Sequence, residues 1–175
     1  MMQQNVPVHL SFDENSEHVP ESAGFAVCLP ADIDTDLVIA GRYLRTKDRA
    51  VWAAHVFEDL DPAIAPRLKG SVIVAGKNFG CGSSREQAAI AIKEAGVVAV
   101  IAPSFARIFF RNAINIGLPL IECSVSCEES STIKFNLTEG WVETGGKRYN
   151  VRPLSPRMRE ILTAGGLVEY WRANQ

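Results

Sequence analysis

The sequence lacks an excess of charge of either sign. Its 175 residues include 18 lysines and arginines and 20 aspartates and glutamates, which gives a formal net charge of −2. Nucleic acids and anionic membranes are bound through extended basic surfaces, so this balance predicts no partner of either kind. Any anionic ligand must be bound by a few local positive charges.

Long apolar runs are also missing, and the opening residues do not have the pattern of a secretory signal. No apolar run reaches the roughly 18 residues that a membrane-spanning helix needs. The opening MMQQNVPVHLSFDENSEHVPE is polar and has neither the basic nor the apolar part of a secretory signal. We therefore expect a cytoplasmic chain. A hydrophobic content of 47% over this length is typical of one globular domain.

Cysteine is scarce, and its spacing predicts no metal site. The four cysteines are Cys28, Cys81, Cys123 and Cys127. Only Cys123 and Cys127 are close in sequence, and neither a second ligand pair nor a nearby histidine accompanies them. We expect reduced thiols and no structural metal ion.

The middle of the chain alternates between two periodicities. Apolar runs typical of buried strands are followed by helical patterns that end at glycine, in the order strand, helix, strand, helix, strand over residues 71–123. This order predicts parallel strands joined by right-handed crossovers. GFAVCLP, at residues 24–30, predicts an earlier buried strand. We assign residues 1–24, which include VPVHLSF, to an N-terminal arm or edge strand and residues 25–175 to one α/β domain.

The flanking segments are less regular. Residues 31–48 are rich in Asp, Thr and Gly and are expected to form a strand end and a loop. A helix is predicted after Asp48, which can cap it, with Val51, Ala54 and Phe57 as its apolar stripe. Towards the C-terminus, two antiparallel strands are expected around TGGK, followed by a capped helix with a Gly-Gly break.

The stretch GKNFGCGSSREQA, at residues 76–88, joins the strand SVIVA to the next helix. One interpretation of this stretch is purely structural. Ser83 and Glu86 have the spacing of a capping box, and the glycines permit a sharp turn between strand and helix.

A second interpretation is that the same stretch binds a small carboxylate. Gly80 and Gly82 are expected to leave backbone N–H groups uncovered at a helix N-terminus. Ser83 and Ser84 add hydroxyls, and Arg85 adds a planar fork that matches a carboxylate. N–H donors and an arginine favour the ionised form of a neighbouring hydroxyl, so a serine here is also suited to remove a proton beside that carboxylate.

Three blocks of the sequence carry a family resemblance. GKNFGCGSSRE resembles the serine loop of the aconitase superfamily, and SFARIFFRNAINIGLPLIEC resembles the segment that follows this loop in the small subunits of isopropylmalate isomerases and homoaconitases. DIDTDLVIAGRYLRT resembles their first signature. The resemblance extends from around Cys28 to the C-terminal helix. It implies an α/β fold of the swivelling β/β/α three-layer type, similar to the C-terminal domain of aconitase.

The resemblance also implies a hydro-lyase that is active only when a small and a large subunit assemble. The large subunit is expected to carry a [4Fe–4S] cluster, and this chain is expected to bind no cofactor or metal. The implied reaction dehydrates and rehydrates a malate-like di- or tricarboxylate and so moves its hydroxyl to the adjacent carbon. Cys81 lacks the neighbours that a cluster site needs and is expected to be a small buried residue in a tight turn.

Individual roles follow for the residues that match. Ser83 matches the serine that, as an alkoxide, removes the proton from carbon, while Ser84 and Arg85 match residues that bind the substrate carboxylate. Asp36 matches an aspartate that pairs with a histidine of the large subunit; alternatively, it only closes an Asx turn. Gln87 stands where the family usually has histidine, and it forms hydrogen bonds but does not titrate.

The segment RYLRT, at residues 42–46, is expected to distinguish substrates. In such small subunits it faces either the isopropyl group of isopropylmalate or the third carboxylate of homocitrate. Arg45 suits a carboxylate, with Leu44 and Thr46 beside it, and facing an isopropyl group it would lose hydration without compensation. Leucine-pathway enzymes are the more abundant, and Arg45 pointing to solvent is an alternative. We expect isopropylmalate as the substrate and keep homocitrate as the alternative.

Two other classes of function are also considered. A carboxylate-binding module with this fold but without catalysis would be consistent with Gln87. An RNA-binding role, known for some aconitase relatives, is disfavoured by the near-neutral charge.

Overall fold

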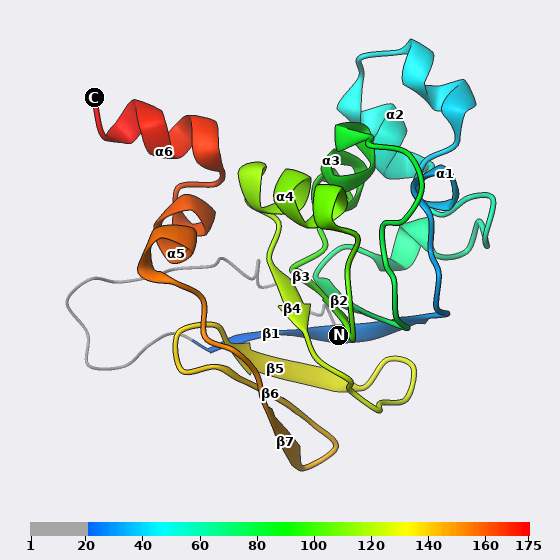
Figure 1. Cartoon of the computed structure of the whole chain (residues 1–175). Helices are drawn as coiled ribbons and strands as arrows, with labels where there is room; N and C mark the ends of the chain where they lie inside the picture. The colour runs from blue at the N-terminus through cyan, green and yellow to red at the C-terminus, as the bar shows by residue number, and fades with distance from the viewer. Residues whose placement is uncertain (1–20) are drawn as a thin grey trace, which may run out of the picture.

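The computed structural model describes residues 21–175 (Figure 1). They form a seven-stranded, curled sheet with the order β4-β3-β2-β1-β5-β6-β7 and helices packed against it. Most of the predicted N-terminal arm, including VPVHLSF, lies outside the described residues. The last part of that segment already belongs to the first strand, which begins at Ser22.

The alternating half of the sequence forms parallel strands, as predicted. They are β1 (Ser22–Leu29), β2 (Ser71–Ala75), β3 (Ala99–Ala102) and β4 (Leu120–Glu122). The crossover helices are α3 (Glu86–Glu94) and α4 (Arg107–Asn115). Each is followed by a glycine with positive φ, Gly96 or Gly117, which allows the chain to turn back towards the next strand.

An antiparallel half extends the sheet from β1. It consists of β5 (Thr132–Asn136), β6 (Trp141–Thr144) and β7 (Lys147–Asn150). Gly145 and Gly146 have φ values of 56° and 73°, which a two-residue hairpin turn requires. The hairpin predicted at TGGK is therefore confirmed.

Alternate residues of the central strands face different hydrophobic cores. In β2, Ile73 belongs to the core beneath α1 to α4, whereas Val72 and Val74 belong to the core formed with β5, β6 and α5. Helices α1 to α4 lie together on one face of the parallel strands, and α5 and α6 lie apart from them (Figure 1). The predicted α/β fold is thus confirmed.

The remaining elements are short. They are α1 (Thr35–Val38), the 3-10 helices η1 (Gly41–Arg45) and η2 (Ala65–Arg67), α2 (Arg49–Ala54), α5 (Pro156–Thr163) and α6 (Leu167–Ala173). The strand end and loop expected over residues 31–48 therefore contain α1 and η1. Between residues 21 and 175, no helix has the length and hydropathy needed to cross a membrane.

Helix α2 differs from its prediction in length and in its buried face. Asp48 caps it as expected, since its Oδ1 accepts from the Ala50 N–H at 2.9 Å. The helix ends at Ala54, and the turn that follows contains Phe57 at a φ of 60°. Trp52 is buried, whereas Val51 is half-buried and Ala54 is exposed. The predicted apolar stripe is therefore wrong at Val51 and Ala54.

Candidate functional site

The predicted site lies where the carboxyl ends of the parallel strands meet. Beyond Ala75, the chain forms a loop with a single-residue bridge on each side: Cys81 pairs with Asp34, which follows β1, and Phe79 pairs with Phe105, which follows β3. Ligands of parallel α/β sheets bind at this edge. The extension of β2 therefore carries the serine loop, residues 80–85, to the edge of the sheet where ligands bind.

Gly80 has a packing role. Its φ is +80°, and a Cβ placed there would lie 2.2 Å from the Phe109 ring. Its N–H donates to the Ile33 carbonyl at 2.7 Å, so it is not available to a ligand. The prediction of an uncovered N–H group at Gly80 is therefore wrong, because the extension of β2 uses that donor in a backbone bridge.

The tip of the serine loop presents its donors outward. Across residues 21–175, no acceptor is found for the backbone N–H groups of Gly82, Ser83 and Ser84, and all three residues are exposed. The loop is held instead through the carbonyl of Ser83, which accepts from the Thr35 hydroxyl at 3.0 Å and from the Arg85 N–H at 2.8 Å. Hydroxyls and N–H groups are therefore free to meet a ligand.

The capping-box interpretation of this loop is wrong. Helix α3 begins at Glu86 with Arg85 as its N-cap, and no side chain provides a cap hydrogen bond. Ser83 lies before the N-cap because the pairing of Cys81 with Asp34 carries the extended chain past the position expected for the helix start. The Ser83 hydroxyl therefore does not form the capping hydrogen bond that this interpretation predicted.

Asp36 and Arg85 are brought together from different parts of the chain. Asp36 lies in the first turn of α1, and its Oδ1 accepts from Nη1 of Arg85 in an ion pair. The Arg85 side chain is 25% exposed and that of Asp36 is 59% exposed. A guanidinium has five N–H donors, so this contact orients Arg85 and leaves other donors for a carboxylate.

The alternative role for Asp36, closing an Asx turn, belongs to Asp34 instead. Oδ1 of Asp34 accepts from the Leu37 N–H at 2.8 Å and caps α1. The expected pairing of Asp36 with a histidine involves another chain and stays a prediction.

The predicted selectivity residues differ in what they contact. Leu44 is half-buried and packs against the core beneath the helices, and the Thr46 hydroxyl accepts from the Asp48 N–H at 3.0 Å. Arg45 is exposed at the end of η1, with no acidic partner among residues 21–175. Arg45 is therefore the member of this group that is most free to meet a charged ligand.

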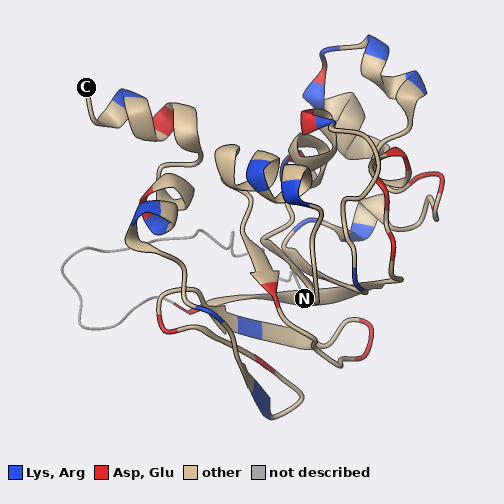
Figure 2. Cartoon of the chain, viewed as in Figure 1, with Lys and Arg blue, Asp and Glu red and all other residues tan. Residues whose placement is uncertain are grey.

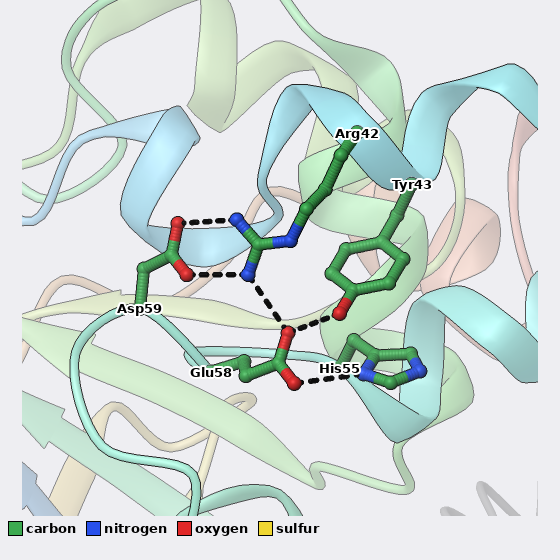
Figure 3. Close-up of polar contacts among 5 residues, drawn as sticks. All are labelled: Arg42, Tyr43, His55, Glu58 and Asp59. Atoms are coloured by element: carbon green, nitrogen blue, oxygen red, sulfur yellow. Dashed lines mark hydrogen bonds and ion pairs between the residues drawn. The ribbon is translucent and has the colours of Figure 1, made fainter.

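A polar cluster that sequence reasoning missed supports this segment (Figure 3). Arg42 contacts Glu58 at 2.9 Å and Asp59 at 2.5 and 2.9 Å, and Tyr43 donates its hydroxyl to Glu58. His55, at the end of α2, contacts Glu58 at 3.3 Å and stacks on Tyr43. Hydrogen bonds from Tyr43 and Arg42 lower the pKa of Glu58, and Arg42 likewise lowers the pKa of Asp59.

The cysteines are arranged differently from their sequence spacing. Cys127 lies beside Cys28, with 3.7 Å between the sulfur atoms, and not in a pair with Cys123. Burial and the contact with Cys127 raise the pKa of Cys28 to about 11, and burial followed by nearby aspartates raises the pKa of Cys81. Within the described part of the chain, no group of three or more His, Cys, Asp or Glu residues is placed to hold a metal ion.

Charges of both signs are interspersed over the surface (Figure 2). Arginines and lysines lie on α2, α4, α5 and β7, with acidic residues among them and in the connecting loops. The absence of a nucleic-acid partner stays a prediction.

Comparisons with known proteins agree with this geometry. The model of the aconitase C-terminal domain family matches residues 31–124. The 3-isopropylmalate dehydratase small subunit of Aliarcobacter butzleri is 51% identical over 82% of this chain and 89% of its own. The methanogen homoaconitase small subunit of Methanothermobacter thermautotrophicus is 50% identical over 80% of this chain and 84% of its own.

A solved structure gives the same result for the fold. A crystal structure of 3-isopropylmalate dehydratase from Methanocaldococcus jannaschii superposes with a TM-score of 0.84 and 43% sequence identity, covering 89% of this chain and 95% of that one. The chain therefore belongs to the aconitase C-terminal domain family, within the group of small subunits that includes those of 3-isopropylmalate dehydratase and homoaconitase.

Proposed function

We propose that this chain is the small subunit of a 3-isopropylmalate dehydratase, a hydro-lyase of leucine biosynthesis that converts 2-isopropylmalate to 3-isopropylmalate by dehydration and rehydration. The observation that carries the proposal is the exposed Ser83 next to the Arg85–Asp36 ion pair, at the ligand-binding edge of a sheet of this family. These groups face outward, so the substrate is enclosed only when a large subunit covers the serine loop.

Ser83 is the proposed base. As an alkoxide, its Oγ removes the proton from the carbon next to the substrate carboxylate. The N–H groups of Gly82 to Ser84 and the guanidinium of Arg85 favour the ionised oxygen, because each places positive charge near it. The cluster that we expect on the large subunit supplies the Lewis acid for the departing hydroxyl.

Arg85 and Ser84 bind the carboxylate. Asp36 occupies one N–H of the Arg85 guanidinium, and the remaining donors form a planar fork for the two carboxylate oxygens. Ser84 precedes Arg85 in the chain and is exposed, and its hydroxyl is proposed to donate a further hydrogen bond to the carboxylate. Asp36 is well exposed, so its second oxygen is open to the histidine expected on the large subunit.

A homoaconitase is the second candidate, and Arg45 is the observation that favours it. An exposed arginine without an acidic partner in residues 21–175 suits the third carboxylate of homocitrate. Leu44 packs inward and leaves Arg45 as the polar face of the segment. We place isopropylmalate first because most of the similar curated small subunits carry the dehydratase name.

The test is anaerobic reconstitution with the large subunit of the same organism. Dehydration of isopropylmalate and of homocitrate is followed by the absorbance of the alkene product, with each subunit alone as the control. We expect turnover of isopropylmalate only when both chains are present. A preference for homocitrate would reverse the order of the two candidates, and lack of turnover with either acid would contradict a hydro-lyase.

We place the complex in the cytoplasm, which agrees with four free cysteines.

A further inference from the structure

The 3-10 helix η1 is held only in part by burial. None of its five residues is fully buried, and Tyr43 and Leu44 pack against the core as half-buried side chains. Helices of this kind are short and have poor hydrogen-bond geometry, so a single exposed turn is not stable by itself. Groups outside η1 must therefore fix its conformation, and with it the position of Arg45 at its end.

Glu58 is the centre of the contacts that reach η1 (Figure 3). Its Oε2 accepts from Arg42 at 2.9 Å and from the Tyr43 hydroxyl, while its Oε1 lies 3.3 Å from His55 Nδ1. Asp59 binds the same guanidinium in bidentate fashion, at 2.5 and 2.9 Å. One short acidic turn thus holds two consecutive residues of η1.

The backbone and ring of Tyr43 are held as well. Its ring stacks on His55 with 4.0 Å between ring centroids and 12° between planes. Its carbonyl accepts from Nε1 of the buried Trp52 at 3.0 Å. Tyr43 is therefore fixed at its hydroxyl, its ring and its carbonyl, immediately before Leu44.

The charges in this cluster are satisfied by one another. Hydrogen bonds from Tyr43 and Arg42 lower the pKa of Glu58, and those from Arg42 lower the pKa of Asp59, because they favour the ionised carboxylates. Both carboxylates are directed at Arg42 and neutralise its charge. Of the two arginines in the segment, only Arg45 has no acidic partner among residues 21–175.

We propose that Glu58 and Asp59 are positioning residues for substrate selectivity. By fixing Arg42 and Tyr43, they set where residues 44–46 stand relative to the serine loop. The inference rests on the proposed function and assigns selectivity partly to a turn that does not belong to the predicted substrate-binding segment.

The experiment uses Glu58→Gln, which keeps the shape of the side chain and removes its charge. In the reconstituted complex, we expect the ratio of kcat/KM for isopropylmalate to kcat/KM for homocitrate to change by about 3- to 10-fold, mainly through KM. Hydrogen exchange of the full-length chain, measured by mass spectrometry, should be about tenfold faster in a peptide covering residues 41–46.

Glu143→Gln is the matched control. Glu143 contacts Arg148 at 3.0 Å on the β6–β7 hairpin, and these side chains are 34% and 53% exposed. Glu58 and Arg42 are 31% and 52% exposed, so the two substitutions remove the same charge from a similar surface. The control should leave both the selectivity ratio and exchange over residues 41–46 unchanged.

The proposal requires that Glu58→Gln changes both the ratio of the two kcat/KM values and the rate of hydrogen exchange over residues 41–46. The proposal is overturned if Glu58→Gln behaves like Glu143→Gln, if exchange accelerates without a change in the ratio, or if the ratio changes without faster exchange. A wild-type complex without turnover of either acid would count against the proposed function instead. The exchange comparison would then still decide whether Glu58 positions residues 41–46.

Discussion

The serine loop and the segment 41–46 are both exposed, but different forces hold them. The serine loop is anchored by its backbone: Gly80 packs on Phe109 and donates to Ile33, and the Cys81 carbonyl accepts from the Thr35 N–H at 2.9 Å. The segment 41–46 packs against the core only through the half-buried Tyr43 and Leu44, and its Arg42 and Tyr43 side chains are held by an acidic turn. One loop is therefore fixed through backbone bridges and the other depends in addition on surface charge.

This difference suits the roles that we propose for the two loops. A base must stand at one place relative to the reacting carbon, and a position set by backbone bridges and core packing does not depend on the protonation of surface groups. Selectivity has to vary among substrates, and exposed charges can be exchanged with little effect on the core. The same domain can thus keep its chemistry and change its substrate.

Gly80→Ala should disrupt the backbone-anchored loop most strongly. The left-handed φ costs about 1–2 kcal/mol in a residue with a Cβ, and the overlap with Phe109 adds about 1–3 kcal/mol. We expect a loss of about 2–5 kcal/mol in the free energy of unfolding, measured with urea. Gly82→Ala is the control: its Cβ would meet Asp34 at 3.4 Å, so only the backbone strain remains. Equal losses in the two variants would contradict the packing role of Gly80.

Arg85→Lys separates the chemistry of the serine loop from its anchoring. Lysine keeps the charge towards Asp36 but cannot form the planar fork, so kcat/KM of the reconstituted complex should fall about 10- to 100-fold. The melting temperature should hardly change, because exposed ion pairs contribute little to stability. Arg107→Lys, on the exposed face of α4, serves as the comparison and should keep full activity. An Arg85→Lys complex with wild-type kcat/KM would argue against carboxylate binding at this residue.

Thr35→Val removes the side-chain contact that holds the tip of the serine loop. Valine has the same shape but loses the hydrogen bond to the Ser83 carbonyl, worth about 1 kcal/mol. We expect kcat to fall roughly fivefold as the loop loosens, a change that corresponds to about 1 kcal/mol. Thr35→Ser retains the hydroxyl and should restore most of the rate. If valine and serine behave alike, the hydroxyl does not position the loop.

Acid should affect the segment 41–46 more than the serine loop. Glu58 and Asp59 have lowered pKa values in the folded chain, so their contribution to stability is present above the pKa of the unfolded chain, about 4, and is lost as the pH falls through the folded values. Wild type and Glu58→Gln should therefore differ most in unfolding free energy near pH 6 and converge towards pH 3. A difference that is constant over this range would show that the charge of Glu58 is not what stabilises η1.

Local sequence patterns predicted the elements whose signals are local. The parallel strands, the hairpin at Gly145 and Gly146 and the glycine ends of α3 and α4 all follow from periodicity and turn chemistry. The capping-box interpretation of Ser83 fails because that pattern is short, and the bridge between Cys81 and Asp34, which displaces the helix start, joins residues far apart in sequence.

The support of the predicted selectivity segment could not be predicted. Glu58 is 15 residues from Tyr43 and Asp59 is 17 from Arg42, and they lie in a turn without periodicity. Helices as short as η1 also fall below the length at which a helical period can be recognised. Cys28 and Cys127 are 99 positions apart in sequence and are neighbours only in the folded chain. The spacing of the cysteines gives no indication of this contact.

The most direct test of the central claim is the dehydration rate of an anaerobically reconstituted complex that contains Ser83→Ala. Ser83 is exposed and caps no helix, so the variant should fold and bind the large subunit as the wild type does. We expect co-purification to be unchanged and turnover to fall about 10²- to 10⁴-fold, as loss of a catalytic base predicts. Wild-type turnover by the assembled variant would contradict the account, because the serine loop would then bind the substrate without acting on it.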